Sequence, residues 1–181
     1  MFKIIVCVNK KGVIGKDGKL LYRIKNDIEN FKSMTSYNGV VIMGRKTFES
    51  LPNRKPLPGR VNIIMTRDVE YKVEPMENLY ITNSIEDTIE LCDAFFSDKE
   101  LFVIGGQSIY EQFIETGLVS EMILTVVDDD ADGDAYFPPF DSEGWYVYYE
   151  SSKQSGLSGR NKVSFSLKVL KKKDDASLPR Q

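Results

Sequence analysis

Short apolar runs recur along the chain, and patterns with the spacing of amphipathic helices lie between several of them. Runs rich in Val, Ile and Phe are typical of buried strands, and they occupy residues 2–8, 40–43, 61–65, 79–82, 101–104 and 122–127. Helical patterns occupy residues 25–36, 45–51, 84–96 and 107–115, and Ser84 with an acid three positions later has the form of a helix N-terminus. Strands that alternate with helices predict an α/β fold, with a largely parallel sheet and helices on both faces.

The last third of the chain has a different pattern. Residues 121–127, 145–150 and 162–170 have strand character without helices between them, which predicts an antiparallel C-terminal edge to the sheet. Long segments without a regular pattern are often functional loops, and three are present: 9–24, 52–60 and 128–141. Because no repeat or linker interrupts the chain, we predict one domain over 1–170 and a polar tail over 171–181.

Composition and charge exclude several classes of protein. The 181 residues, 41% of them hydrophobic, are enough for one domain with its own core. The net charge of −3 argues against a nucleic-acid or anionic-membrane surface, and no apolar run approaches the ~18 residues of a membrane-spanning helix. The N-terminus lacks the features of a secretory signal, and the only cysteines, Cys7 and Cys92, lie in apolar segments as expected of buried thiols. We therefore expect a cytoplasmic monomer.

The sequence contains no histidine. This absence excludes Ser-His-Asp and Cys-His nucleophilic machinery and histidine-ligated zinc. Any acid–base chemistry must therefore come from carboxylates, tyrosine, lysine or bound water.

Asp27 is the first candidate for that chemistry. If residues 25–36 are helical, Ile24, Asp27, Ile28 and Phe31 share one face, which should pack inward because three of the four are apolar. A carboxyl group buried without a charged partner has a raised pKa and can act as a general acid. The alternative is an aspartate that merely favours the first turn of a helix.

Two segments are candidates for binding phosphate. Gly105-Gly106 lies between a strand and a helix, where backbone N–H groups face an anion, although steric needs explain two glycines equally well. Gly39 and Gly44 have Walker A spacing, but Arg45 replaces the required lysine, which disfavours a P-loop NTPase. Three cations follow the ends of two predicted strands: Arg45, Lys46 and Arg67. They could surround an extra phosphate, such as the 2′-phosphate of NADP, or they could be solvated surface charges.

Six ordered segments together resemble one family, dihydrofolate reductase, over about residues 1–170. They are VIGKDGKLLYRIKNDIENFK, VVIMGRKTFESLP, PLPGRVNIIMTR, VIGGQSIYEQF, ILTVVD and GDAYFP. The resemblance implies an eight-stranded, mostly parallel sheet with four helices. It also implies NADPH-dependent reduction of 7,8-dihydrofolate to tetrahydrofolate, with hydride transfer to pterin C6, and a site open to antifolate small molecules.

The resemblance also assigns residues to the reaction. Asp27 would hold the pterin ring and promote N5 protonation through water, Thr125 would bond its carboxylate, and Tyr22, where the family usually has Trp, would hold an ordered water. The resemblance also assigns Leu20 both to the catalytic positions and to the apolar wall of the substrate site. Arg60 would grip the α-carboxylate of the glutamate tail. The implied substrate contacts are Ile5, Cys7, Leu20, Asp27, Ile28, Phe31, Lys32, Leu51, Leu57, Arg60, Ile104 and Thr125.

The NADPH site is implied in the same way. The nicotinamide and its ribose would contact Cys7, Val13, Ile14, Gly15 and Lys19. The 2′-phosphate and adenosine would contact Gly44, Arg45, Lys46, Thr47, Thr66 and Arg67. The pyrophosphate would contact Gly105, Gly106, Gln107, Ser108, Ile109 and Tyr110. Asp134 matches an aspartate that closes the mobile loop around 16–20, and no metal is implied.

Some positions depart from the family pattern, and two other functions stay open. Leu21-Tyr22 replaces the usual Pro-Trp, Lys25 stands two residues before Asp27, and Gln107 replaces a frequent third glycine. The related pyrimidine reductases of riboflavin biosynthesis have this fold, but Asp27 and Arg60 favour folate. A non-catalytic folate- or dinucleotide-binding protein is the second alternative, and a retained acid at Asp27 argues against it.

Overall fold

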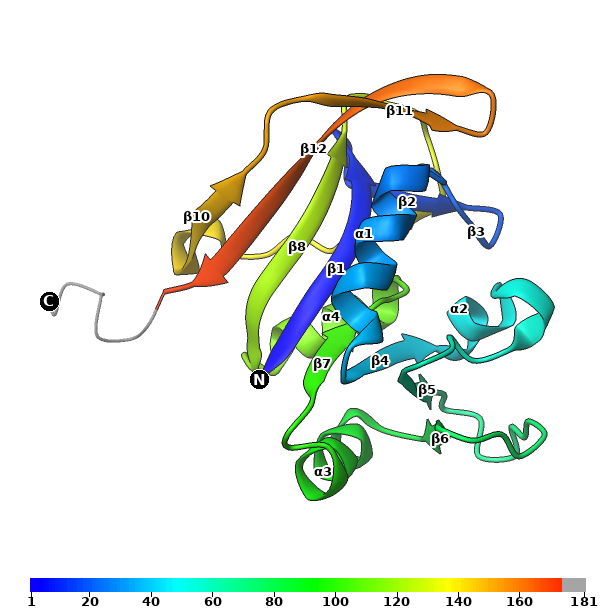
Figure 1. The fold of residues 1–181 in the computed structure, drawn as a ribbon. Helices are drawn as coiled ribbons and strands as arrows, with labels where there is room; N and C mark the ends of the chain where they lie inside the picture. The colour runs from blue at the N-terminus through cyan, green and yellow to red at the C-terminus, as the bar shows by residue number, and fades with distance from the viewer. Residues whose placement is uncertain (174–181) are drawn as a thin grey trace, which may run out of the picture.

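A twisted, mostly parallel sheet forms the centre of the molecule, and its helices lie on both faces (Figure 1). The computed structural model describes residues 1–173. The helices are α1 (Lys25–Ser36), α2 (Arg45–Glu49), α3 (Ile85–Phe95) and α4 (Gln107–Glu115), with single 3-10 turns at Pro52–Arg54 and Ser142–Gly144. The strands are β1 (Phe2–Asn9), β2 (Val13–Lys16), β3 (Lys19–Leu20), β4 (Gly39–Gly44), β5 (Val61–Met65), β6 (Leu79–Thr82), β7 (Glu100–Val103), β8 (Val119–Val127), β9 (Ala135–Tyr136), β10 (Trp145–Glu150), β11 (Gln154–Ser158) and β12 (Asn161–Lys172).

The strand order confirms the predicted architecture. The main sheet runs β10-β12-β8-β1-β7-β4-β5-β6, and β11 pairs with β12 to make nine strands rather than eight. Neighbours from β8 to β6 are parallel, and the antiparallel edge begins at β12, since β8 pairs in parallel with β1. The carboxyl ends of six parallel strands therefore lie along one edge, which is where open α/β sheets bind ligands.

The two faces of the sheet are covered differently. Alternate residues of β1, among them Ile4 and Val6, join one continuous core with the buried sides of α3 and α4. On the opposite face the core is divided into two clusters. One contains Phe48 of α2 with Ile5 packed against it, and the other contains Ile24 with Cys7 packed against it. On this face the two apolar clusters meet along β1, with Ile5 in one cluster and Cys7 in the other.

Local signals explain most of the boundaries. Ser84 caps α3 by accepting a hydrogen bond from the Asp87 N–H at 3.0 Å, as the sequence predicts. Helix α2 ends at Glu49 rather than at residue 51, because Pro52 starts a 3-10 turn. Strand β12 continues to Lys172, past the expected start of the tail at Lys171. The rest of that tail, residues 174–181, lies outside the described residues.

The sequence patterns miss four short strands. Part of the 9–24 segment is a hairpin of β2 and β3, in which Asp17 and Gly18 have φ angles of 51° and 70°, as a tight two-residue turn requires. Strand β9 pairs with β2 to complete a small second sheet. Strand β11 has the sequence QSGLS, in which Leu157 is the single large apolar residue, so no apolar run marks it. The segment expected to be a long loop is therefore a small sheet next to the main one.

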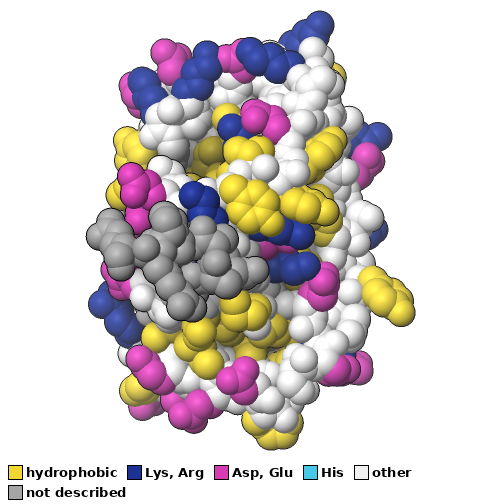
Figure 2. Space-filling view, turned by 90° about the vertical axis from the view of Figure 1, so that its left-hand side faces the viewer, with side chains coloured by type: hydrophobic (Ala, Val, Ile, Leu, Met, Phe, Trp, Pro, Cys, Tyr) yellow, Lys and Arg dark blue, Asp and Glu magenta, His cyan; other side chains and the backbone are white. Residues whose placement is uncertain are grey.

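Strand β10 forms one edge of the main sheet, at the left of Figure 1. Figure 2 shows this side of the molecule, with exposed hydrophobic side chains among Lys, Arg, Asp and Glu side chains. Tyr146, Val147 and Tyr148 of β10 are between 45% and 61% exposed. Charges of both signs are interspersed on this face. In the described part of the chain, no helix is long and apolar enough to cross a membrane.

Candidate active site

Asp27 lies in the first turn of α1, and its carboxylate accepts a hydrogen bond from the Thr125 hydroxyl of β8. Burial raises the pKa of Asp27, and the Thr125 hydrogen bond lowers it by less. Lys25 forms an ion pair with Glu29 at 3.7 Å and not with Asp27, because side chains at i and i+2 of a helix point apart. The carboxyl group therefore lies beside a hydroxyl and forms no ion pair within residues 1–173, as the acid hypothesis requires.

The face of α1 around Asp27 is only partly buried, which corrects one expectation. Ile24, at the N-cap, is fully buried, but Ile28 is 43% exposed and Asp27 and Phe31 are half-buried. The face is buried at Ile24 and is more open from Asp27 to Phe31. A helix that borders a binding site has this pattern, whereas one packed into a core does not.

The raised pKa of Asp27 has a consequence for stability. A carboxyl whose pKa is raised by folding favours the folded state at low pH, and that contribution is lost as the pH rises through the folded-state pKa. Ionisation of Asp27 therefore costs the fold stability that the protonated carboxyl does not. We expect Asp27→Asn to raise the melting temperature of the ligand-free protein at neutral pH, with the difference disappearing in acid. Thermal unfolding followed by circular dichroism measures this, and an equal or lower melting temperature at neutral pH would contradict it.

Arg60 is the second functional group on this face. It is 6% exposed, its Nε donates to the Pro58 carbonyl at 3.1 Å, and its Nη1 donates to the Thr35 hydroxyl at 2.9 Å. Its guanidinium lies 5.7 Å from the centre of the Phe31 ring. Burial lowers the pKa of Arg60, but a guanidinium remains charged in proteins. The sequence did not single out Thr35, although its place four residues after Phe31 on one helix face was a usable signal.

Apolar side chains lie around these two polar groups. Ile5, Leu51, Leu57 and Ile104 are all partly buried members of the same cluster. Cys7 belongs to the neighbouring cluster, and burial raises the pKa of its thiol far above the usual range. The structure thus brings together the apolar residues that the sequence assigned to a folate wall. Leu20 is an exception, since the β2–β3 hairpin leaves it 63% exposed, and Lys32 also faces solvent.

The N-terminus of α4 has the features of a phosphate site. No side chain caps it, so its first backbone N–H groups can meet an anion. The cis peptide Gly105-Gly106 precedes it, and a Cβ on Gly105 would lie 3.0 Å from the Tyr110 ring. Ile109 and Tyr110 are buried, and the Tyr110 hydroxyl donates to the Ile5 carbonyl at 2.9 Å. Ile109 and Tyr110 therefore support the turn, and the backbone N–H groups at the start of α4 can bind a ligand.

Cations gather at the carboxyl ends of β4 and β5. Gly44 and Met65 are opposite each other in the parallel ladder, so the residues that follow them share one edge: Arg45, Lys46, Thr47, Thr66 and Arg67. The Arg45 guanidinium forms an ion pair with Asp68 at 3.0 Å and lies 5.4 Å from the centre of the Tyr71 ring. Gly44 also donates its N–H to the Gly105 carbonyl at 2.8 Å, so this edge adjoins the α4 turn. One extended anionic ligand can therefore reach both.

The segment 9–24 is fastened to the segment 128–134. Asp134 Oδ2 accepts the Asp17 N–H at 2.9 Å, and the Asp134 N–H donates to the Gly15 carbonyl at 3.1 Å. A Cβ on Gly133 would lie 2.3 Å from Val13, so only glycine permits this approach. Val13 is fully buried here, Ile14 and Gly15 are nearly so, and Lys19 is exposed. The assigned loop-closing residue thus contacts the segment that it would close.

Two side chains in the site act in ways that the sequence did not suggest. The Tyr22 hydroxyl donates to Asp129 at 2.5 Å, which leaves only its acceptor lone pairs for a water near Asp27. Gln107 Oε1 accepts the Tyr136 N–H of β9 at 2.9 Å, linking the α4 turn to the small sheet.

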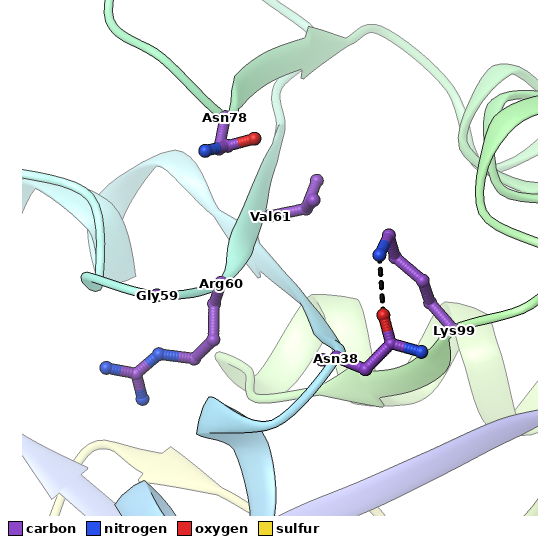
Figure 3. A pocket seen from close by; sticks show the side chains of 7 residues that line it. Asn38, Gly59, Arg60, Val61, Asn78 and Lys99 are labelled. Carbon is purple, nitrogen blue, oxygen red and sulfur yellow. Dashed lines mark hydrogen bonds between the residues drawn. The ribbon is translucent and has the colours of Figure 1, made fainter.

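A separate pocket of about 150 Å³ lies at the amino ends of β4 and β5 (Figure 3). Its lining includes Asn38, Asn78 and Lys99, and Lys99 Nζ donates to Asn38 Oδ1 at 2.6 Å. Arg60 also lines this pocket, but its guanidinium points away from Asn38 and Lys99 (Figure 3). The guanidinium therefore serves the α1 face. Within residues 1–173, no group of His, Cys, Asp and Glu has a metal-binding arrangement.

Comparison with known proteins identifies the family of the chain. The family model for dihydrofolate reductase matches residues 1–172. The chain belongs to the dihydrofolate reductase family. A dihydrofolate reductase of Staphylococcus aureus (strain Mu50 / ATCC 700699) is 33% identical over 171 residues, which cover 94% of this chain and 98% of that protein.

More distant members of the family agree. The bifunctional dihydrofolate reductase-thymidylate synthase of Daucus carota is 32% identical over 160 residues, 83% of this chain and 30% of that longer protein. Among solved structures, dihydrofolate reductase from Enterococcus faecalis, complexed with NADP(H) and RAB-propyl, matches with a TM-score of 0.80. It is 26% identical, over 96% of this chain and 97% of that chain. Both the sequence and the fold therefore assign this family.

Proposed function

We propose that this chain reduces 7,8-dihydrofolate to 5,6,7,8-tetrahydrofolate with NADPH, and that Asp27 promotes protonation of N5. The observation that carries the proposal is a single partly buried carboxyl, bonded to a hydroxyl on β8 and surrounded by apolar residues, in a member of this family. Such a carboxyl can accept hydrogen bonds from the N–H groups along one edge of a ring, and it can supply a proton through water. The wall around it excludes bulk solvent and orients flat rings.

The substrate fits the rest of this face. The apolar residues Ile5, Leu51, Leu57 and Phe31 suit the ring systems, and Arg60 suits the α-carboxylate of the glutamate tail. A guanidinium has five N–H donors, and the two bonds to Pro58 and Thr35 leave three for a ligand. Those two bonds also fix the plane of the guanidinium, which favours a bidentate contact with a carboxylate.

The donor set at the edge of the sheet fits NADPH. The uncapped α4 turn suits a pyrophosphate, and the cations after β4 and β5 suit a 2′-phosphate. When bound, NADPH supplies the hydride. The protein's part is to bind it through these groups, to hold the acceptor ring against Asp27 and to keep water out with the segment 9–24.

Arg45 should discriminate between the two nicotinamide cofactors. We expect Arg45→Ala to raise KM for NADPH by about 10- to 100-fold, the worth of one or two charge-assisted hydrogen bonds, and to leave KM for NADH nearly unchanged. Lys72→Ala, which removes an exposed cation elsewhere, is the control. Steady-state kinetics with both cofactors measure the ratio. Equal losses for NADPH and NADH would remove the 2′-phosphate assignment.

The direct test of the activity is oxidation of NADPH, followed by loss of near-ultraviolet absorbance, with dihydrofolate or with the ribosylamino-pyrimidine of riboflavin biosynthesis. We expect oxidation that depends on dihydrofolate alone. Oxidation with the pyrimidine alone would favour the related reductases, and tight NADPH binding without turnover would favour the non-catalytic alternative. Arg60, which suits a carboxylate tail, supports folate.

We further propose that the enzyme is one domain over residues 1–170 that works as a cytoplasmic monomer on small molecules, antifolates included, without a nucleic-acid or membrane partner. The free thiols of Cys7 and Cys92 support a reducing compartment. The net charge of −3 and the interspersed charges in Figure 2 support the absence of a nucleic-acid partner.

A further inference from the structure

The Tyr22–Asp129 hydrogen bond joins two segments that are far apart in the sequence. Tyr22 is only 7% exposed, and its hydroxyl donates to Asp129 Oδ2 at 2.5 Å. Burial, with this hydrogen bond, raises the pKa of Tyr22 to about 12, and the same bond holds the pKa of Asp129 below its usual range. At neutral pH a phenol therefore donates to a carboxylate, which is a stronger bond than one between neutral groups.

Strand β8 connects this bond to the catalytic carboxyl. Thr125 and Val127 point to the same face of the strand, since side chains alternate. The Thr125 hydroxyl bonds Asp27, and Val127 packs in one cluster with Tyr22 and Cys7. Asp129 is the second residue after the end of the strand at Val127. One short stretch of backbone therefore sets the positions of both Asp27 and the Tyr22 ring.

Tyr22 also fastens the segment 9–24 near its α1 end, where the Arg23 N–H donates to the Ser158 hydroxyl of β11 at 3.0 Å. The segment is held at its start by Asn9, whose Nδ2 donates to the Ala131 carbonyl at 2.8 Å, and near its middle by Asp134. Tyr22 is two residues before the N-cap of α1 and five before Asp27. Movement of Tyr22 would therefore be transmitted to the helix that carries the acid.

We propose that Asp129 is a positioning residue for the reduction: it holds the Tyr22 hydroxyl, and thereby keeps the segment 9–24 closed on β8 and the Tyr22 ring in place beside Cys7. Asp129 touches neither substrate nor cofactor in this account and acts through Tyr22. The effect on turnover rests on the proposed function, but the effect on the segment does not.

The test compares five variants: Asp129→Ala, Asp129→Asn, Tyr22→Phe, the double variant Asp129→Ala/Tyr22→Phe, and Asp130→Ala. Asp130→Ala is the control. It removes the same charge from the neighbouring exposed acid and leaves the backbone N–H of residue 130, which bonds Asp129, in place. Tyr22→Phe keeps the buried ring, so it should fold. Limited cleavage by trypsin reports opening of the segment without substrate, since the segment contains Lys10, Lys11, Lys16, Lys19 and Arg23. Steady-state kinetics report kcat and KM.

We expect Asp129→Ala and Tyr22→Phe each to speed cleavage within 9–24 and to lower kcat about tenfold, the worth of one such hydrogen bond. The double variant should lose no more than the worse single variant, and Asp129→Asn, which keeps an acceptor oxygen, should recover most of the loss. Asp130→Ala should behave as wild type. Cleavage and kcat in Asp129→Ala equal to those of Asp130→Ala, or losses that multiply in the double variant, would overturn the proposal. If wild type does not reduce dihydrofolate, the proposed function fails, and cleavage alone still decides the role of Asp129.

Discussion

Asp27→Asn is expected to lower kcat for dihydrofolate reduction at neutral pH by about 10²- to 10³-fold, within the range that a positioned general acid contributes. The amide keeps the size of the side chain and can still accept the Thr125 hydroxyl hydrogen, but it cannot hold or pass on a proton. NADPH binding should be unchanged, because the proposed cofactor contacts lie on β1, in the segment 9–24 and at the carboxyl ends of β4, β5 and β7, and none of them lies on α1. Initial rates and a fluorescence titration with NADPH measure the two quantities.

Glu29→Gln is the matched control for Asp27→Asn. It makes the same chemical change on the same helix, at an exposed carboxylate whose partner is Lys25. We expect it to leave kcat near the wild-type value. In wild type, kcat should fall as the pH rises through the raised pKa of Asp27, because the protonated form is lost, and Asp27→Asn should lack this dependence. An undiminished rate in Asp27→Asn at neutral pH would refute the acid role.

Arg60→Ala is expected to raise KM for dihydrofolate by about 10- to 100-fold with a smaller effect on kcat, since removal of a charged hydrogen-bonding partner costs about 1.5–3 kcal/mol. Arg60 would bind the glutamate tail in the ground state and the transition state alike, so its loss affects mainly KM. Thr35 is not left without a partner, because its hydroxyl still donates to the Phe31 carbonyl at 2.8 Å. The kinetic effect should therefore be separable from misfolding.

A truncated substrate and a second arginine serve as controls for Arg60→Ala. With a dihydropteroate that lacks the glutamate, wild type and Arg60→Ala should have similar KM values, because the group that Arg60 binds is gone. Arg54→Ala removes an exposed arginine from the same 52–60 loop and should change neither substrate's KM. The assignment of Arg60 to the carboxylate would fail if Arg60→Ala weakened both substrates equally.

The sequence predicted those parts of the fold that periodicity determines. The bounds of α1 and α4 follow from apolar spacing and from the glycines before α4, and Ser84 marks the start of α3 through its cap. Strands β2, β3 and β9 were missed because two to four residues carry no periodicity. Strands β2 and β3 pair with each other as a hairpin, whereas β9 pairs with β2 across more than a hundred residues, as Val13 does with Tyr136. Tertiary partners, and not local propensity, make these strands.

The candidate site was predictable to a similar extent. Asp27 could be found from a carboxylate on an otherwise apolar helix face, and the structure adds its bond to Thr125. Ile28 was expected to be buried, since a periodic pattern does not distinguish a helix facing a core from one facing a binding site. The bonds of Tyr22 to Asp129 and of Gln107 to Tyr136 could not be predicted, because both join segments whose distance only the folded chain sets.

The central proposal is that this chain catalyses direct hydride transfer from NADPH to dihydrofolate in the site around Asp27. The measurement that tests this claim most directly is the fate of deuterium from NADPH labelled at C4 of the nicotinamide, followed by nuclear magnetic resonance of the product. We predict that the label is found at C6 of tetrahydrofolate. Label that is lost to water, or that is found in no pterin product while NADPH is consumed, would contradict the account.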